Sequence, residues 1–234
     1  MNGPVATTRR RRAVRALDPR PSTLDWLLWQ LADSALPTGG FAHSAGLEAA
    51  WQQGAIPDTA ALESFLDASL AQLGHAGLPL MTAAYDVPAE LPEWDALCDA
   101  FTTNHVANRA SRAQGQALLR AARQIFGGDP APVLPFGHFY PVFGSELRRL
   151  EIPRDTAMRL LFFNHLRGLL AAAVRLNIVG PLQAQSLQHQ FAPRAESALQ
   201  RCSHLTVSDL AQVSPLLDLW QGAQDRLYSR LFQS

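Results

Sequence analysis

The chain has 234 residues, of which 47% are hydrophobic and 17% charged, and this composition suffices for one domain with a sizeable core. Its 20 arginines and 20 acidic residues give a formal net charge of zero, but six of the arginines lie in the first 20 residues. The remainder therefore carries 14 arginines against 19 acids, which is not typical of a nucleic-acid-binding body. No stretch approaches the roughly 18 uninterrupted apolar residues of a membrane span.

The N-terminal segment, residues 1–21, is rich in arginine and shows no hydrophobic periodicity. Pro4, Pro19 and Pro21 lie within it, and we expect it to be a disordered arm. A solvated tail is favoured over a localisation signal, a transit peptide or a polyanion contact, because charge runs are commonly disordered. The arm lacks the apolar core segment of a secretory signal.

Residues 22–234 show the 3.6-residue apolar repeat of helices and no convincing alternating strand. This pattern predicts an all-α fold, a single-domain bundle of about ten helices without a sheet. The expected helices are 24–33, 42–53, 59–73, 78–86, 93–103, 106–126, 138–150, 154–176, 182–203 and 215–232. Asp58 is expected to cap the third of these, and Pro193 to disturb the ninth.

The connection between the first two helices is the most informative stretch, QLADSALPTGGFAHSAGLEAAWQQG at residues 30–54. Pro37 fixes its own φ, while Gly39 and Gly40 accept backbone angles that a side chain would forbid. These residues predict a tight turn, with the second helix opening near Phe41 to Ser44. A phosphate-binding loop is less favoured, because the chain has no Gly-x-x-x-x-Gly-Lys-Ser/Thr run and no lysine.

The helix expected at 106–126 has two opposite stripes. A seam of small apolar residues predicts close helix packing and consists of Val106, Ala110, Ala113, Ala117 and Ala121. The polar stripe consists of Arg109, Arg112, Gln116, Arg120 and Arg123. A solvent-facing role is favoured for this stripe over a partner-binding one. Gly115 costs about 1 kcal/mol relative to alanine in mid-helix, which predicts a close backbone approach there.

The helix expected at 154–176 is apolar over well over half of its circumference, so we expect it to be central and packed from several sides. Its arginines are Arg159, Arg167 and Arg175, and the last two share a narrow polar side with Asn164. These arginines could pair with buried carboxylates or extend outward to solvent, or they could form a patch that faces a partner or a second subunit. The two interpretations are equally favoured.

No residue pattern indicates an enzyme or a metal site. The histidines form no His-x-x-x-His pair or His-Glu-x-x-His run. Cys202 and His204 come nearest to a ligand pair, but side chains two residues apart on a helix point to different sides. There is no Gly-x-Ser-x-Gly motif. Cys98 and Cys202 are expected to be free thiols in a reducing compartment. We expect no catalytic residue, no bound metal and no cofactor.

The run LADSALPTGGFAHSAGLE at residues 31–48 resembles the signature of UreF, a family of urease accessory proteins. Residues 109–115, 138–144 and 166–176, the last followed by Gly180, resemble later blocks of the same family in the same order. Together the blocks span roughly residues 24–232. Ala42 and Ala45 stand where bulkier or polar residues are frequent, and the arginine-rich arm is additional.

The resemblance implies a non-catalytic, cytoplasmic, helical chaperone that helps to deliver nickel to apo-urease. It also implies a homodimer that docks on UreD (also called UreH) and recruits the GTPase UreG, with no membrane or nucleic acid involved. The alternatives are a GTPase-activating or regulatory protein that acts on UreG through an inserted arginine, an unrelated helical adaptor, or an enzyme of unrecognised helical type.

Two segments are the candidates for partner surfaces: the Pro-Thr-Gly-Gly-Phe-Ala-His-Ser turn and the C-terminal residues 228–232. For residues 228–232, a partner surface and a helix packed in the core of the chain itself are equally favoured. The residues expected to contact partners are Pro37, Gly39, Gly40, Phe41, His43, Ser44, Glu48, Arg109, Arg112, Gly115, Arg167, Arg175, Tyr228, Arg230 and Phe232.

Overall fold

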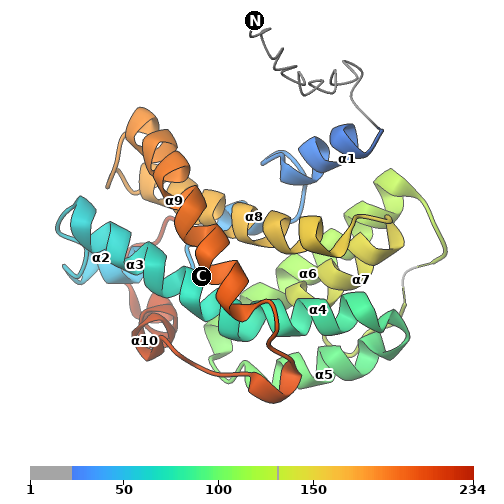
Figure 1. Cartoon of the computed structure of the whole chain (residues 1–234). Helices are drawn as coiled ribbons and strands as arrows, with labels where there is room; N and C mark the ends of the chain where they lie inside the picture. Colours follow the sequence, from blue (N-terminus) through green and yellow to red (C-terminus); the bar gives the residue numbers. More distant parts are fainter. Residues whose placement is uncertain (1–22, 131) are drawn as a thin grey trace, which may run out of the picture.

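The computed structural model describes residues 23–130 and 132–234, and in these residues the regular elements are all helical, as expected (Figure 1). The expected arm at 1–21 lies outside the described residues. The α-helices are α1 (Thr23–Ala32), α2 (Leu47–Gln52), α3 (Thr59–Gln72), α4 (Leu78–Asp86), α5 (Leu91–Phe101), α6 (His105–Phe126), α7 (Phe139–Arg149), α8 (Arg154–Arg175), α9 (Pro181–Cys202) and α10 (Pro215–Ala223). Short helical turns are η1 (Gly40–Ala42), η2 (Leu73–Gly77), η3 (Pro88–Glu90), η4 (Val207–Asp209) and η5 (Gln224–Arg226).

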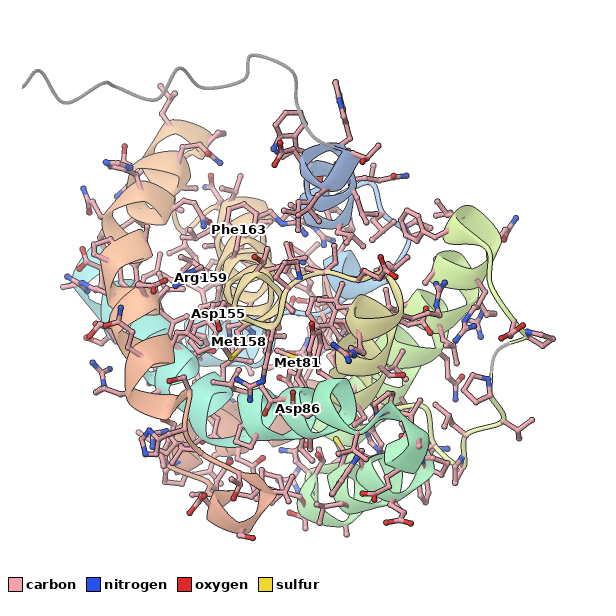
Figure 2. The ribbon with its side chains drawn as sticks, turned by 45° about the vertical axis from the view of Figure 1, so that its right-hand side comes forward. Met81, Asp86, Asp155, Met158, Arg159 and Phe163 are labelled. Atoms are coloured by element: carbon pink, nitrogen blue, oxygen red, sulfur yellow. The ribbon has the colours of Figure 1, made fainter. Side chains whose placement is uncertain are left out.

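Helix α8 is the centre of the bundle, which confirms the expectation from its wide apolar surface. Figure 2 looks nearly along it and shows α1, α4, α7 and α9 around it. Arg159 lies on its outer side and pairs with Glu196 of α9 at 2.9 Å. Among the described helices, α8 also has the length and mean hydropathy of a membrane span, but most of that stretch is buried within the bundle. These are the properties of a core helix.

Helices α3 and α4 form one nearly continuous rod, because the π-helical turn η2 joins them. The sequence predicted both helices but not this junction. Asp58 caps α3 as expected, since its side chain accepts a hydrogen bond from the backbone N–H of Ala61 at 2.8 Å. A Cβ at Gly74 would lie 2.7 Å from the sulfur of Cys202, so this glycine lets α9 approach the junction closely.

The second helix begins later than predicted, at Leu47 rather than near residues 41–44. Ala45 and Gly46 have φ values of 52° and 88°, which interrupt any helix that starts before them. A side chain at position 46 would also crowd α10, because a Cβ there would lie 3.0 Å from the backbone nitrogen of Gln221.

The last helix ends earlier than predicted, at Ala223 instead of residue 232. After η5 the chain is irregular, with bends at residues 228–229 and 231–232, and we call residues 227–234 the tail. The tail's backbone N–H groups at Leu231, Phe232 and Gln233 donate to Glu48 and to the Ala42 carbonyl, so they are not available for a helix. The hypothesis of a C-terminal core helix is therefore wrong, although Phe232 itself is buried.

Two proline predictions also need correction. Helix α5 spans Leu91–Phe101 rather than 93–103, because Pro92 fits into its first turn, where no N–H donor is needed. Helix α9 continues through Pro193 without a break. Pro193 lies on the exposed side of α9, where water can serve the carbonyl that has lost its donor.

Helix α7 packs across both α4 and α6, and the predicted small-residue seam of α6 is only partly buried. Val106, Ala110 and Ala121 are buried as expected, but Ala113 is exposed. The close approach predicted at Gly115 is confirmed, since a Cβ there would overlap the carbonyl oxygen of Gly137, just before α7.

Candidate interaction site

The segment between α1 and α2, residues 37–46, forms a compact corner that is held by its own backbone. Gly39 has a φ of 75°, and its carbonyl accepts a hydrogen bond from Ala42 at 3.0 Å. The carbonyl of Gly40 accepts from His43 at 3.2 Å, which forms the turn η1. Glycine at position 39 is the residue type that adopts this left-handed conformation without strain.

Polar side chains of α8 bind the C-terminal end of α1 and the corner that follows it. Asn164 donates to the carbonyl of Leu31 at 3.3 Å, and Arg167 donates to the carbonyl of Ala32. These two bonds satisfy orphan carbonyls at the C-terminal end of α1. About two helical turns further along α8, Arg175 donates to the carbonyl of Phe41 at 2.5 Å. The polar side of α8 therefore binds backbone carbonyls of this chain. The sequence had predicted buried carboxylates, solvent or a partner protein as its contacts.

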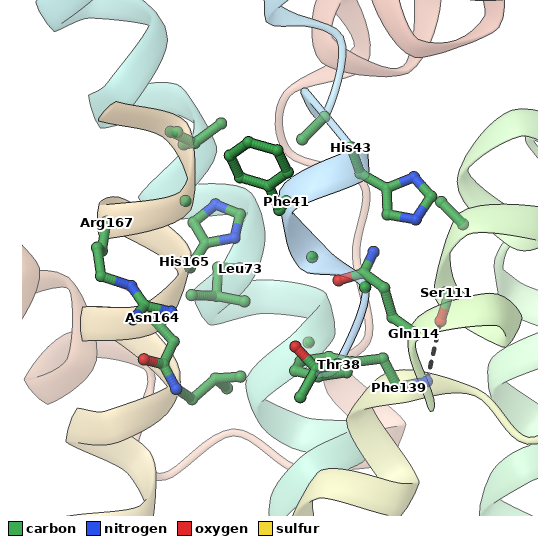
Figure 3. Close-up of a pocket in the computed structure, with 18 of the residues that line it drawn as sticks. Thr38, Phe41, His43, Leu73, Ser111, Gln114, Phe139, Asn164, His165 and Arg167 are labelled. Atoms are coloured by element: carbon green, nitrogen blue, oxygen red, sulfur yellow. Dashed lines mark hydrogen bonds between the residues drawn. The ribbon is translucent and has the colours of Figure 1, made fainter. Parts of the chain in front are cut away.

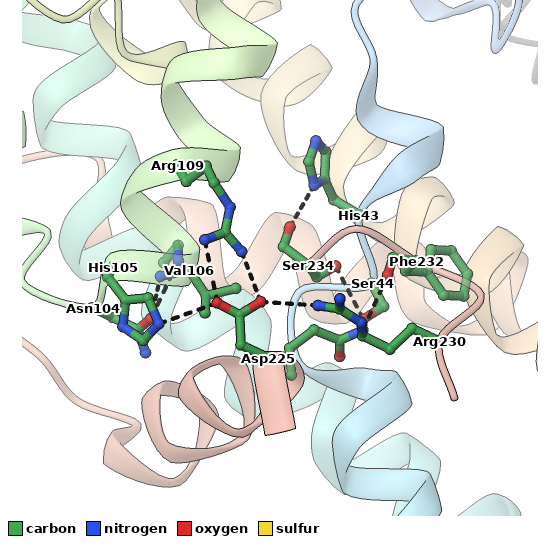
Figure 4. A network of polar contacts seen from close by, with 12 residues as sticks. His43, Ser44, Asn104, His105, Val106, Arg109, Asp225, Arg230, Phe232 and Ser234 are labelled. Atoms are coloured by element: carbon green, nitrogen blue, oxygen red, sulfur yellow. Dashed lines mark hydrogen bonds and ion pairs between the residues drawn. The ribbon is translucent and has the colours of Figure 1, made fainter. Parts of the chain in front are cut away.

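The tail packs against the corner and is joined to it by hydrogen bonds. The backbone N–H of Ser44 donates to the carbonyl of Ser234 at 2.6 Å, and Gln233 donates to the carbonyl of Ala42 at 2.8 Å. The ring of His43 hydrogen-bonds through Nδ1 to Ser234 Oγ (Figure 4). Burial, and secondarily the charge of Arg109, lowers the pKa of His43, so its neutral form is favoured.

The buried carboxylate of Glu48 fixes the tail to α2. It accepts hydrogen bonds from the backbone of Leu231 at 2.7 Å and of Phe232 at 3.2 Å, and from the side chain of Gln224 at 2.6 Å. Only 1% of Glu48 is exposed, so these bonds replace the water that its charge would otherwise bind.

Arg175 joins the corner to the tail through aromatic rings as well as carbonyls. Its guanidinium carbon lies 3.9 Å from the ring centroid of Phe41 and 4.2 Å from that of Phe232. The same side chain donates to the carbonyl of Leu231 at 3.4 Å. Stacking between two rings suits the flat guanidinium of arginine better than a lysine ammonium.

An ion-pair cluster extends this contact to α6 (Figure 4). Asp225 of η5 accepts two hydrogen bonds from Arg109, at 2.9 and 3.2 Å. It also pairs with His105 at 3.2 Å and with Arg230 at 3.0 Å. Hydrogen bonding to Arg109 holds the pKa of Asp225 below its usual value. The tail thus contacts α2 and α8 directly, and Arg230 links it to α6 through Asp225.

A cavity of about 920 Å³ lies between the corner and the core of the bundle (Figure 3). Thr38, Phe41 and His43 of the corner line one side, and His165 of α8 and Gln114 of α6 line others. The walls are mostly apolar. The bonds that hold the corner to α8 and to the tail therefore also close this cavity on one side.

His165 is the most strongly perturbed histidine in the cavity wall. Burial lowers its pKa from 6.5 to about 4, and its Nε2 hydrogen-bonds to Ser69 Oγ at 2.7 Å. In the unfolded chain this imidazole takes up a proton as pH falls below about 6.5, whereas in the folded chain it stays neutral to about pH 4. The unfolded state binds more protons in this window, so stability falls as pH falls through it.

We expect His165 alone to make the free energy of unfolding about 2 kcal/mol lower at pH 5 than at pH 7.5. Urea denaturation of the wild-type protein and of His165→Gln at both pH values measures this share. The matched control is His189→Gln, at an exposed position of α9. If His165→Gln keeps the full pH dependence of the wild-type protein, the assignment to His165 is wrong.

The expected contact residues do not all meet. The site unites Phe41, His43, Ser44, Glu48, Arg109, Arg175, Arg230 and Phe232. Pro37, Gly39 and Gly40 shape the corner, Arg167 anchors the end of α1 that precedes it, and Tyr228 of the tail is fully exposed. Arg112 and Gly115 lie further along α6. Sequence reasoning missed Asn164, Gln224, Asp225 and Ser234 as members, and no local pattern marks residues that act through long-range contacts.

The cysteines are both buried free thiols, as expected. Burial raises the pKa of Cys98 to about 12. The sulfur of Cys202 lies 3.7 Å from Nδ1 of His75. Cys202 therefore contacts His75 and not His204, the residue considered from the sequence. Within the described ranges, no group of three or more His, Cys, Asp or Glu side chains is arranged to hold a metal ion.

Fold and site define an all-α bundle protein in which a glycine-rich corner is bound by the chain's C-terminal residues. The model of the UreF family matches residues 56–192. "Urease accessory protein F" of Oryza sativa subsp. indica is 40% identical over 222 residues, which cover 88% of this chain and 84% of that protein. The protein of the same name from Arabidopsis thaliana is 38% identical over 226 residues, or 91% and 94% of the two chains.

A further relative is an uncharacterized urease accessory protein UreF-like chain of Schizosaccharomyces pombe, 31% identical over 225 residues. These cover 87% of this chain and 94% of that one. The chain belongs to the UreF family of urease accessory proteins.

Proposed function

We propose that this chain is a non-catalytic, cytoplasmic subunit of a nickel-delivery complex that activates apo-urease. In this proposal a homodimer of the chain docks on UreD (UreH) and, with it, recruits the nickel-carrying GTPase UreG. Membership of the UreF family supports the class of function, and the named partners come from the resemblance of residues 31–48 and the later blocks.

The corner with its bound tail is the observation that carries the proposal. The family signature and the chain's last residues, far apart in sequence, form one continuous surface with a defined shape. Phe41 of the corner and Tyr228 and Leu231 of the tail expose large hydrophobic side chains. Exposed aromatic side chains beside anchored arginines are the composition that protein interfaces favour.

The test is co-purification of the full chain with UreD and UreG from the same genome, followed by nickel-dependent activation of apo-urease. We expect Phe41→Ser with Tyr228→Ser to weaken complex formation by about 2 kcal/mol, roughly thirtyfold in Kd. Leu182→Ser, also at an exposed leucine but at the start of α9, is the control and should bind normally. A folded wild-type chain that binds neither partner would overturn the proposal.

A regulatory role in GTP hydrolysis by UreG remains as the second proposal, and Arg112 favours it. Arg109 and Arg175 are engaged within the chain, whereas Arg112 has no ion-pair partner among the described residues. Measuring UreG GTP turnover with wild-type protein and with Arg112→Gln separates the roles. If Arg112→Gln forms the complex but no longer stimulates GTP turnover, Arg112 acts as an inserted arginine. If Arg112→Gln and the wild-type protein give the same turnover, the role of the chain is that of a scaffold.

A further inference from the structure

The outward side of α6 carries a polar row with four arginines and no acidic residue. The row consists of Arg109, Arg112, Gln116, Arg120 and Arg123, and α6 contains no Asp or Glu at any position. Steps of three and four residues keep these side chains on one side of the helix over about 21 Å. We call this set the arginine row. The chain as a whole is neutral, so this is a local concentration of positive charge.

Carboxylates of the chain itself occupy both ends of the arginine row. At one end Asp225 pairs with Arg109 at 2.9 Å, and at the other end Glu146 pairs with Arg123 at 2.7 Å. Both contacts join α6 to other elements of the fold. The row therefore already binds two carboxylates of the chain itself.

The middle of the row is open. Arg112 and Arg120 form no ion pair with any residue in 23–130 or 132–234. The guanidinium of Arg112 lies 5.3 Å from the ring centroid of Phe136, and Gln116 donates to the Phe136 carbonyl at 2.9 Å. These contacts hold Arg112 in place while its charge is left without a direct partner. Asp99 lies nearby, but its pKa is lowered mainly by the hydrogen bond from Asn108 and then by His138, and the charge of Arg112 makes only the smallest contribution.

A groove of about 600 Å³ runs along the first half of the row. It is lined by Thr102, Thr103, His105, Asn108, Arg109, Arg112, Ala113 and Gln116. Most of these side chains carry hydrogen-bond donors, so the groove suits an extended acidic chain better than an apolar one.

We propose that the middle of the arginine row binds a carboxylate-rich segment of a partner protein, with Arg112 and Arg120 each pairing with one carboxylate. The two arginines are eight residues apart, about 12 Å along the helix, so they match two separated carboxylates and not one compact anion. No backbone N–H groups converge here as they do around phosphates, and both filled positions of the row hold carboxylates. This surface is additional to the corner with its tail, and the proposal holds whichever partner carries the segment.

The probe is a fluorescein-labelled oligo-glutamate peptide, titrated with the full chain at several salt concentrations. We expect Arg112→Gln with Arg120→Gln to weaken binding roughly tenfold and to reduce its salt dependence. The matched control is Arg148→Gln with Arg201→Gln, which removes the same charge from two exposed arginines that also have no ion pair in the described ranges. The control should bind as the wild-type protein does.

Charge reversal provides a second measurement that does not depend on loss of binding. Arg112→Glu with Arg120→Glu should prefer a labelled oligo-lysine peptide over oligo-glutamate, and a circular dichroism melt checks that it is folded. Equal weakening in row and control variants, no binding of oligo-glutamate by the wild-type protein, or displacement of the peptide by inorganic polyphosphate at lower concentration than by free oligo-glutamate would each overturn the proposal.

Discussion

Glu48→Gln is expected to release the tail from the corner while leaving the helical bundle folded. A glutamine has the same size, but its amide offers one acceptor oxygen and turns an NH₂ group toward donors. The Leu231 and Phe232 amides would then lose a charged acceptor in a buried place, which costs about 3 kcal/mol. Hydrogen exchange at these two amides should become roughly a hundredfold faster.

The matched control for this prediction is Glu63→Gln, the same chemical change at an exposed carboxylate that pairs with Arg194 of α9. It should leave exchange in the tail unchanged. Limited trypsin digestion gives an independent readout, because Arg226 and Arg230 flank the start of the tail. Equal protection of the Leu231 amide in the wild-type protein and Glu48→Gln would show that Glu48 does not hold the tail.

The role of Glu48 also shows where sequence reasoning stops. The signature run predicted that position 48 matters, and the apolar periodicity placed it on the second helix. Its partners lie 176 to 184 residues away, at Gln224, Leu231 and Phe232. A helical repeat describes one element at a time, so it predicted more helix at residues 224–232 instead of a tail bound elsewhere.

Most helices were predicted within one or two residues, because their apolar repeat is long and regular. The exceptions have specific causes. Ala45 adopts a left-handed conformation that is uncommon for alanine. The residue type at position 45 therefore gave no indication that α2 begins only at Leu47. At the π-helical η2, Gly74 packs against Cys202 and Gly77 against Tyr140, and a local pattern does not show such contacts between distant elements.

The arginines of α8 illustrate a different limit. The sequence placed Arg167 and Arg175 on one polar side with Asn164, and the structure confirms that grouping. Their partners are backbone carbonyls, which every residue carries and which therefore leave no trace in a sequence. Residue type alone could not distinguish these anchors from an interface patch.

Gly115→Ala is expected to be among the most destabilising single substitutions in this chain, although alanine is the better helix former. An added Cβ would overlap the Gly137 carbonyl and lie 2.5 Å from the carbonyl carbon of His138. That segment cannot move aside easily, because the buried carboxylate of Asp95 accepts backbone hydrogen bonds from residues 136–138. The distances are 2.9 Å from Phe136, 2.9 Å from Gly137 and 2.7 Å from His138.

The expected loss is about 3 kcal/mol or more, measured as a lower urea midpoint at an unchanged m value. Gly168→Ala on α8 is the matched control, because no atom lies within 4 Å of the Cβ position there. It should stabilise the chain by up to about 1 kcal/mol through helix propensity alone. The two substitutions are chemically identical and both lie within long helices, so opposite signs can only come from what each methyl group meets. Equal stability of the two variants would mean that the segment before α7 does not lie against α6 in solution.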